Sequence, residues 1–401
     1  MAQTSSGTTA VHHAVPFWRD VRALRIMSQV IFILAVAIVA GMLYANLTHA
    51  LEKRGLSGGF DFLRLEAGFE IGESPISYKP ANSYGRAFLV GVLNTLRVTV
   101  VGIFFATILG VVAGVARLSD NWLVRSISGI YIEVIRNTPL LVQLFFWYFA
   151  VMFKAPPVSQ SLELPGPIYV HKRGVSIPWA YPTSSFQAWI YYLAGGAVAA
   201  AVLWFVLGKL REAQPGQGGV LSHPALASGL ALLAIPGLGW FLVGERPLIW
   251  EVPLLQKFNF KGGLTLTPEF TALFLGLVVY TGAFIAEVVR AGILAVHKGQ
   301  IEAAKALGLT NMQTLRLIIL PQALRVIIPP LTSQYLNLAK NSSLAVAIGY
   351  PDLYSVGGTI YNQTGRPVPV VVMIMGSYLV MSLVTSLFMN IYNRAVQLVE
   401  R

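Results

Sequence analysis

The sequence predicts an all-α integral membrane protein with about eight transmembrane helices. Hydrophobic residues make up 55% of the chain and charged residues only 11%, well below the roughly 25% that is usual in a soluble domain. The apolar residues also gather in runs of about twenty residues or more, the length that a helix needs to cross the hydrocarbon core. These runs cover residues 26–47, 88–116, 130–153, 188–207, 225–243, 271–296, 326–348 and 370–391.

Charge and cysteine content exclude several kinds of function. The net charge is +12, but the basic residues are scattered through the loops, so lipid headgroups rather than nucleic acid are the expected counter-charge. The chain has no cysteine, which excludes a disulfide framework and thiol chemistry.

The first apolar run, 26–47, follows a polar tail of residues 1–25 that is rich in arginine near its end. A signal peptide is the alternative, but the run is long and no small-x-small cleavage site follows it, so we expect a retained helix. An even number of spans puts both termini on one side, and the density of Lys and Arg modestly favours the cytoplasm. The extracytoplasmic loops are then 48–86, 154–186, 244–268 and 349–368.

Residues 299–321, called the elbow below, form an island of mixed polarity between two apolar runs, with the sequence GQIEAAKALGLTNMQTLRLIILP. Strong helix formers precede Gly308, which suits the left-handed turn that ends a helix. Thr310 and Gln313 have the spacing of a capping box and begin a second helix, which Pro321 then disturbs. We therefore expect a helix–glycine–helix unit beside the bilayer.

Two readings of the elbow remain open on physical features alone. Ala303 and Ala304 follow a glutamate and give the first helix a smooth surface that a partner's groove could accept. The alternative is an ordinary cytoplasmic loop between two spans.

The residue order of the elbow resembles the EAA loop of ABC importer permeases: Glu-Ala-Ala, three residues, Gly, nine residues, Ile, one residue, Leu-Pro. In that family the loop forms the coupling helix, which sits in a cleft of the ATPase subunit. The resemblance implies that coupling to an ATPase uses Gly299, Glu302, Ala303, Ala304, Gly308, Leu320 and Pro321.

Polar side chains within the apolar runs are candidates for a solute path, because such groups are costly in a membrane and are often functional. Glu133 and Arg136 share a helix face and are expected to neutralise each other; alternatively, they only fix the start of the third span. Residues 340–343 follow the proline pair 329–330, and a broken helix with polar groups suits a solute site; the alternative is packing between helices. Arg97 is expected to extend toward a membrane interface. The path candidates are Lys340, Asn341, Ser342, Glu133, Arg136, Asn137, Thr138 and Glu287.

The sequence offers no catalytic or metal-binding constellation. It has no Walker A pattern, no His-Glu-x-x-His and no Gly-x-Ser-x-Gly, and its six histidines are dispersed. An energised function would therefore need a nucleotide-binding partner.

Four further stretches resemble the polar-amino-acid importer permeases, the histidine/glutamine/arginine type. They are GVLNTL at 91–96, YIEVIRNTPLLVQLFF at 131–146, YTGAFIAEVVRAG at 280–292 and AKNSSL at 339–344. The match implies a five-helix permease core in two parts, with an N-terminal addition and a two-helix insertion. Those segments are 88–153 and 268–401 for the core, 1–87 for the addition and 154–267 for the insertion. This long layout resembles the larger permease of general L-amino acid importers, the AapQ/BztB type.

The resemblance also implies partners. They are a second, homologous permease in a heterodimer, two copies of an ABC ATPase that binds ATP and Mg, and a periplasmic amino-acid-binding protein, with the bacterial inner membrane as location. The permease itself is expected to bind no cofactor and no metal.

Two other classes of function are weighed against this one. An ion- or proton-coupled secondary transporter would use Glu133, Glu287 and Lys340 as relays, and a third option is a membrane anchor or intramembrane enzyme. The elbow favours the importer, since a secondary carrier has no use for a helix that docks an ATPase. The insertion, with few ionisable residues in its two runs, is expected to lie outside the path, with lipid on one side and the core on the other.

Overall fold

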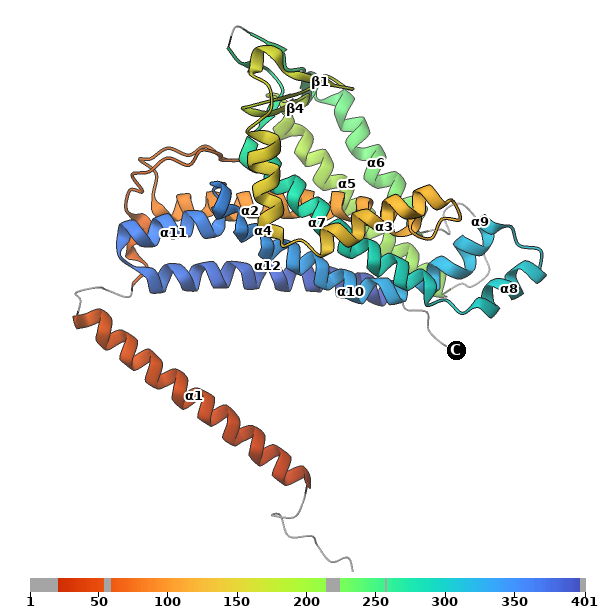
Figure 1. The fold of residues 1–401 in the computed structure, drawn as a ribbon, viewed down its shortest axis with the longest axis horizontal. Coiled ribbons are helices and arrows are strands. Elements are labelled where there is room, and N and C mark those ends of the chain that lie inside the picture. Colours follow the sequence, from red (N-terminus) through yellow and green to blue (C-terminus); the bar gives the residue numbers. More distant parts are fainter. Residues whose placement is uncertain (1–20, 54–58, 214–223, 257, 397–401) are drawn as a thin grey trace, which may run out of the picture.

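The computed structural model describes residues 21–53, 59–213, 224–256 and 258–396. Within them, seven helices are long and apolar enough to cross a membrane, or eight when one bent pair is counted as a span. The prediction of about eight transmembrane helices is therefore confirmed (Figure 1). The long helices are α1 (Val21–Lys53), α2 (Tyr84–Ala116), α5 (Phe186–Ala213), α6 (Pro224–Leu242), α7 (Pro268–Leu294), α10 (Leu320–Asn341) and α12 (Pro367–Val396).

The centre of the bundle is the close crossing of α2 and α7. A β-carbon added at Gly110 would lie 2.5 Å from Ile285, and one at Gly114 would lie 2.6 Å from the carbonyl oxygen of Ala286. Small residues let two membrane helices approach in this way and gain van der Waals contact. α10 packs against α7, and together these helices enclose the main apolar core.

A second apolar cluster closes the other end of α2. The short 3₁₀ turn η1 (Asp61–Arg64) inserts the fully buried Phe62 against Tyr84 and Phe88 of α2. α11 (Leu353–Thr364) and the start of α12 complete this cluster. The predicted loop 349–368 is thus largely a helix, and that prediction is corrected.

The third predicted span, 130–153, is not one straight helix. It is divided into α3 (Trp122–Arg136) and α4 (Leu140–Phe145), which runs on as the π-helix η2 (Phe146–Met152), and the two parts are bent by 107°. Pro139 begins the second part, and a proline disfavours helical geometry in the residue before it.

One side chain compensates for the carbonyl groups that this bend frees. The Gln143 amide donates to the carbonyl oxygens of Ile135, at 2.9 Å, and Thr138, at 3.0 Å. In a membrane such freed backbone groups need a partner within the protein, so Gln143 stabilises the bend.

The seventh predicted span, 326–348, starts earlier and breaks later than expected. Helical structure continues from α9 (Asn311–Thr314) through the π-helix η5 (Leu315–Ile319) into α10. Pro321 follows the π-helix η5 at the start of α10 and does not interrupt the continuous helix. Pro329 and Pro330 do not break the helix; the change to 3₁₀ geometry comes at η6 (Ser342–Ile348).

The loops predicted at 154–186 and 244–268 contain short strands, which the all-α prediction missed. β1, β2, β3 and β8 form a four-stranded antiparallel sheet in that order, while β4 pairs with β5 and β6 with β7. The strands are β1 (Leu162–Leu164), β2 (Ile168–His171), β3 (Gly174–Ile177), β4 (Trp179–Pro182), β5 (Leu248–Glu251), β6 (Leu254–Leu255), β7 (Phe260–Lys261) and β8 (Leu264–Leu266), and the 3₁₀ turn η3 (Val158–Gln160) precedes them.

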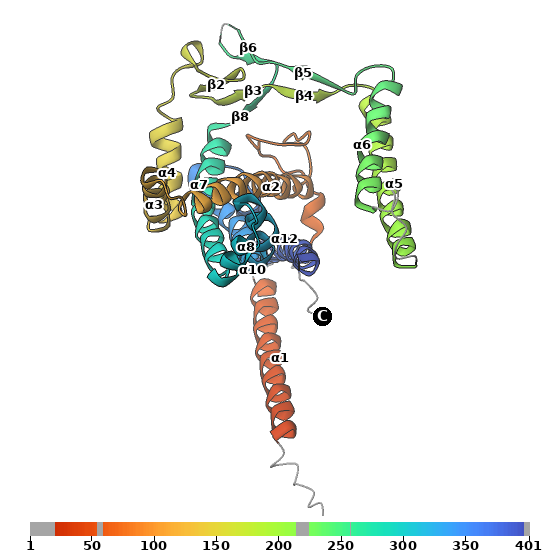
Figure 2. The same ribbon diagram turned by 90° about the vertical axis from the view of Figure 1, so that its right-hand side faces the viewer.

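α5 and α6 form a helical hairpin that stands apart from the core. The indole of Trp189 donates to the carbonyl oxygen of Pro236 at 2.9 Å, and Gly239 lies against the ring of Tyr192. Neither helix packs closely on a core helix, and Figure 2 shows the hairpin hanging beside the bundle below the strands. The expectation that these helices face the core on one side is therefore wrong. α1 also lies away from the bundle (Figure 2).

Candidate functional site

The elbow has the local structure that its sequence predicts. α8 (Lys298–Ala306) begins at His297, whose ring nitrogen accepts from the N–H of Gly299 at 3.1 Å. Gly308 has φ +78°, the left-handed conformation that ends a helix. Thr310 and Gln313 then form a reciprocal capping box, with hydrogen bonds of 2.9 and 3.3 Å.

The exposed face of the elbow differs from the expected one. Ala304 is only 2% exposed and points inward, and its carbonyl oxygen accepts from the N–H of Leu309 at 3.1 Å. The apolar residues offered to a partner are instead Leu307, 81% exposed, and Met312, 70% exposed, beside the exposed Ala303. The elbow lies at one end of the bundle, away from the strands (Figure 1). The other predicted coupling residues there are half-buried or exposed: Gly299, Glu302, Leu320 and Pro321.

The second group of predicted site residues lies around α3 and α7. Glu133 does not pair with Arg136; its carboxylate accepts from the guanidinium of Arg117, at the end of α2, at 2.8 Å. Residues three apart can meet on a helix, but the turn after α2 brings a competing guanidinium to the same carboxylate. The Asn137 amide donates to the Glu133 carbonyl oxygen at 2.8 Å, within the last turn of α3.

The remaining members of this group have their own partners. The guanidinium of Arg136 lies over the ring of Phe284, 5.2 Å from its centroid, a cation–π contact. Glu287 pairs with Arg290 on the same helix at 2.5 Å. The Thr138 hydroxyl donates to the carbonyl oxygen four residues earlier, so it serves the bend.

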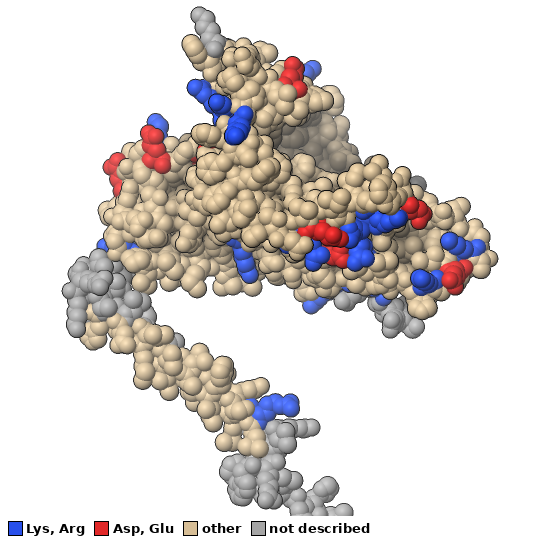
Figure 3. All heavy atoms as spheres, viewed as in Figure 1, with Lys and Arg blue, Asp and Glu red and all other residues tan. Residues whose placement is uncertain are grey.

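A basic cavity opens beside this cluster. Its volume is about 650 Å³, and Glu133 lies on its wall. Figure 3 shows Lys, Arg, Asp and Glu side chains gathered over this part of the molecule. The guanidinium groups on the wall are those of Arg117, Arg125 and Arg290. With more cations than carboxylates, this cavity attracts anionic groups.

The third group, at the end of α10, lines a different cavity. Lys340 and Ser343 lie on the wall of an opening of about 740 Å³ that is otherwise mostly apolar and is completed by Tyr354 and Tyr378. Ser342 is fully buried, and its hydroxyl donates to the carbonyl oxygen of Ala339 at 2.8 Å. Asn341 is half-buried and is not on this wall.

The structure therefore divides the predicted path residues between two places. The basic cavity is built from α2, α3 and α7, and the Lys340 cavity from α10, α11 and α12, and the two have no wall residue in common. Of the predicted residues, Lys340 and Glu133 lie on the walls of these two cavities, and Asn341 and Ser342, adjacent in sequence to Lys340, do not.

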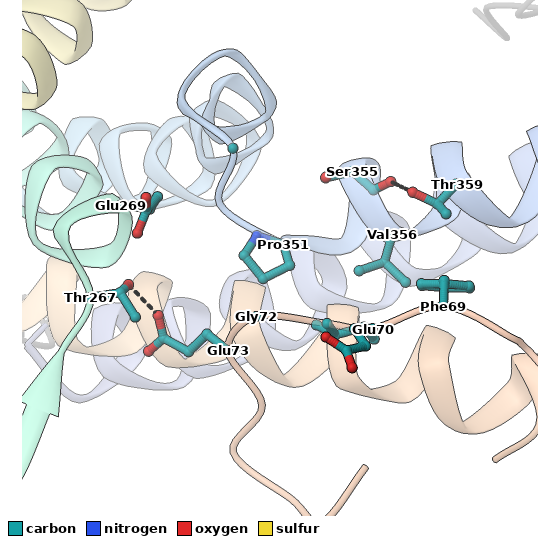
Figure 4. Close-up of a pocket in the computed structure, with 12 residues that line it drawn as sticks. Phe69, Glu70, Gly72, Glu73, Thr267, Glu269, Pro351, Ser355, Val356 and Thr359 are labelled. Atoms are coloured by element: carbon teal, nitrogen blue, oxygen red, sulfur yellow. Dashed lines mark hydrogen bonds between the residues drawn. The ribbon is translucent and has the colours of Figure 1, made fainter. Parts of the chain in front are cut away.

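A third cavity, of about 420 Å³, was not foreseen from the sequence. It lies between the segment before α2, the start of α7 and α11 (Figure 4). Glu73 on its wall pairs with Arg97 at 2.5 Å and accepts from the Thr267 hydroxyl at 2.5 Å. Glu269 on the same wall accepts from the Tyr148 hydroxyl at 2.9 Å. Glu73 lies in a predicted loop, where no local pattern distinguishes it.

Arg97 consequently has a different place from the one expected. Its guanidinium lies 4.4 Å from the ring centroid of Phe270 and forms the ion pair with Glu73. The expectation that it extends toward an interface is replaced by a role as a link between α2, α7 and the segment before α2.

Asp352, at the start of α11, is fully buried. Its carboxylate caps α11 by accepting from the N–H of Ser355 at 2.8 Å, and the Tyr378 hydroxyl lies 3.4 Å from its other oxygen. Burial raises the pKa of Asp352 to about 6, although these hydrogen bonds oppose the shift. Among the described residues, no group of three or more His, Asp or Glu side chains could hold a metal ion.

Comparison with known proteins decides the family. Residues 217–398 match the family described as binding-protein-dependent transport system inner membrane component. The chain is 48% identical over 374 residues to the putative amino-acid ABC transporter permease protein YhdX of Escherichia coli K12, covering 93% of this chain and 94% of that protein. The chain belongs to the amino-acid ABC transporter permease family. This permease is therefore a multi-span transport subunit of the ABC importer type.

Two further likenesses belong beside the first. The permease is 46% identical over 377 residues to the general L-amino acid transport system permease protein AapQ of Rhizobium johnstonii, covering 92% of each protein. A crystal structure of an amino acid ABC transporter with histidines is 22% identical, covers 78% of this chain and 95% of that chain, and has a TM-score of 0.45.

Proposed function

We propose that this permease forms half of the translocation pathway of an ATP-driven importer of L-amino acids. The observation that carries the proposal is the relation over more than nine-tenths of the chain to a general L-amino acid transport permease. The site residues fit that function, because they provide one exposed helical contact at an end of the bundle and separate polar cavities along it.

The elbow is the contact for the ATPase. The chain contains no Walker A pattern, so ATP and Mg belong to a partner subunit. Leu307 and Met312 are exposed beside Glu302, and burying two such apolar side chains contributes about 1.5–3 kcal/mol each. Because Gly308 and the capping box fix the angle between the two helices, a push on α8 passes directly into α10.

The cavity at the end of α10 is the solute site in this proposal. An amino acid carries one carboxylate and one ammonium, and an unpaired charge at membrane depth costs several kcal/mol. Within the described residues Lys340 forms no ion pair, so its ammonium is free for the carboxylate. Ser343 and Tyr354 supply hydroxyl groups on the same wall, and the largely apolar remainder accepts side chains of varied shape.

The basic cavity around Glu133 has a gating or structural role. Its carboxylate and that of Glu287 are each held by an arginine, so neither is free for a substrate ammonium. The same pairing speaks against a secondary transporter that would use them as proton relays, since each carboxylate already has a guanidinium partner.

The importer assembles from this permease, a homologous second permease, two ATPase subunits and a periplasmic amino-acid-binding protein in the inner membrane. The elbow and the end of α12 lie at the same end of the bundle, with the strands and α11 away from it (Figure 1). If the elbow meets a cytoplasmic ATPase, the C-terminus is cytoplasmic and the strands are periplasmic. The core of 88–153 and 268–401 carries the path, with 154–267 outside it.

The test is to co-express the permease with its candidate partners, purify the complex under native conditions and identify every attached chain. Liposomes containing the complex should take up several L-amino acids when ATP and the binding protein are supplied, and a protonophore should not stop uptake. Uptake that needs an ion gradient and ignores ATP would overturn the proposal in favour of a secondary transporter.

A further inference from the structure

The ribbon formed by β4 and β5 has apolar side chains on both of its faces. In their register Trp179 is opposite Glu251 and Ala180 is opposite Trp250, and alternate residues of a strand point to opposite faces. Trp179 and Tyr181 therefore lie on one face and Trp250 on the other. Trp250 is 70% exposed and Trp179 is 45% exposed. A two-stranded ribbon in water would be mostly polar on at least one face, whereas Glu251, on the face of Trp179, is the one charged residue among the eight paired positions.

The apolar surface continues into the neighbouring short ladder. Leu254 and Leu255 of β6 and the nearby Phe258 are all exposed. Contiguous exposed apolar residues of this size mark contact with a membrane or another molecule.

The position of the ribbon relative to the hairpin helices is fixed by hydrogen bonds. Three residues separate β4 from α5, and five separate α6 from β5. The N–H of Thr183 donates to the carbonyl oxygen of Pro247 at 3.0 Å, and its hydroxyl donates to that of Arg246 at 2.8 Å. At no more than about 3.5 Å per residue, the ribbon cannot lie far from the end of the hydrophobic hairpin.

The orientation agrees with a layer at the membrane surface. In Figure 2 the ribbon runs across the ends of α5 and α6 rather than continuing along them. Helices that span the bilayer thus place the ribbon along the plane of its surface. Trp and Tyr are the residues enriched at that level, where an apolar ring and a polar N–H or O–H each find a suitable environment.

We propose that the β4–β5 ribbon lies in the headgroup layer of the membrane, with Trp179, Tyr181 and Trp250 in contact with phospholipid. The ribbon then holds the α5–α6 hairpin at a fixed depth and at a distance from the core, with lipid between them. The four-stranded sheet, which carries Lys172 and Arg173 in its exposed turn, lies beside the ribbon on the side away from the hairpin (Figure 2).

The absence of native cysteines makes a direct test simple. Single cysteines are introduced at Ile249 or Leu254, both exposed, so that the tryptophans remain. Val198→Cys in the middle of α5 is the reference for lipid, and Lys305→Cys on the exposed side of α8, far from the strands, is the reference for water. Each variant of the full-length permease, purified and placed in phospholipid nanodiscs, is spin-labelled, and its accessibility to oxygen is compared with its accessibility to a water-soluble nickel chelate.

We expect oxygen-to-nickel ratios at 249 and 254 that lie between the two references. Ratios equal to that of Lys305→Cys would overturn the proposal and place the ribbon in water. Low accessibility to both reagents would also overturn it, since that result means a protein interface. As a second measurement, phospholipid with brominated chains near the headgroup should quench wild-type tryptophan fluorescence more than that of the Trp250→Phe variant; equal quenching would contradict the proposal.

Discussion

Glu133 pairs with Arg117, sixteen positions earlier in the chain, and not with Arg136 on its own helix. The pair joins the end of α2 to α3 at 2.8 Å and sets the position of the helix that leads into the 107° bend.

A double-mutant cycle should find this pairing. Glu133→Gln and Arg117→Gln are combined and thermal stability in detergent is measured. Because the Glu133 side chain is 67% exposed, we expect a modest coupling free energy of about 0.2–1 kcal/mol. The matched cycle of Glu133→Gln with Arg136→Gln should give a coupling energy near zero. A larger coupling with Arg136 would mean that the pairing described here is wrong.

Replacement of Gly308 tests the elbow. Gly308→Ala should strain the left-handed turn by about 1 kcal/mol, leave membrane insertion unchanged and lower the ATP hydrolysis that solute and binding protein stimulate in liposomes. Glu302→Lys should do the same by changing the exposed face. Gly244→Ala is the control, since Gly244 also has a positive φ and open space around it but lies in the loop between α6 and β5, far from the elbow. Equal loss in the control would show a general defect of folding.

Gln143 is expected to hold the bend between α3 and α4. Gln143→Leu removes the side-chain donor of the Ile135 and Thr138 carbonyl groups, and a carbonyl group left unsatisfied costs about 1–3 kcal/mol. The prediction is a lower midpoint of thermal unfolding, with a loss at least as large for Gln143→Glu, whose ionised carboxylate cannot donate and would face the same carbonyl oxygens. Gln187→Leu, an exposed change on α5, should have no effect. An unchanged midpoint in Gln143→Leu would mean that the bend is maintained by Pro139 alone.

The Lys340 cavity predicts that substitutions at three consecutive residues have different effects on transport and stability. Lys340→Met should raise the KM for several amino acids, because it removes the free cation from the cavity wall. Asn341→Leu, off that wall, should change the KM less. Ser342→Ala should affect stability rather than KM, since its buried hydroxyl serves the Ala339 carbonyl group. Assembled Lys340→Met complexes that import at the wild-type rate would remove the solute from this cavity.

Asp352 predicts a pH dependence of stability. Its folded pKa of about 6 lies above the ordinary 3.8, so ionisation is harder in the folded state. The stability that protonated Asp352 contributes to the folded state is fully present below pH 3.8. It is lost as pH rises through about 6, which lowers the free energy of unfolding by up to roughly 3 kcal/mol. Asp352→Asn keeps a good N-cap and removes the titration. The midpoint of unfolding of the wild type should therefore fall relative to that of Asp352→Asn between pH 4 and pH 7; parallel curves would refute this.

Features whose partners are close in sequence could be predicted, and features that depend on distant partners could not. The helix C-cap at Gly308 and the capping box of Thr310 and Gln313 involve residues within one helical turn. The local structure of the elbow could therefore be predicted from the sequence. The partner of Glu133 could not be read, because two guanidinium groups were within reach and only the path of the chain after α2 selects one. The coupling and solute roles of these residues stay predictions.

The effects of the prolines and the pairing of the strands likewise could not be predicted from local sequence. Pro139 bends its helix sharply, whereas Pro329 and Pro330 are accommodated in α10, although all three interrupt apolar runs. At Pro139 the Gln143 amide donates to carbonyl oxygens beside the bend, and the prolines themselves do not distinguish the two cases. The strand β3 finds its partner β8 nearly ninety residues later, beyond the range of any short pattern.

The chain leaves one strand of the ribbon at Pro182 and returns in the other at Leu248, and these two residues are direct neighbours in the register. In topological terms the whole α5–α6 unit therefore occupies the position of a turn in a β-hairpin. A two-residue turn could close the same ladder without changing the alignment of β4 and β5. An entire pair of membrane helices could thus be gained or removed at a single point of the fold, with the two halves of the bundle keeping their places.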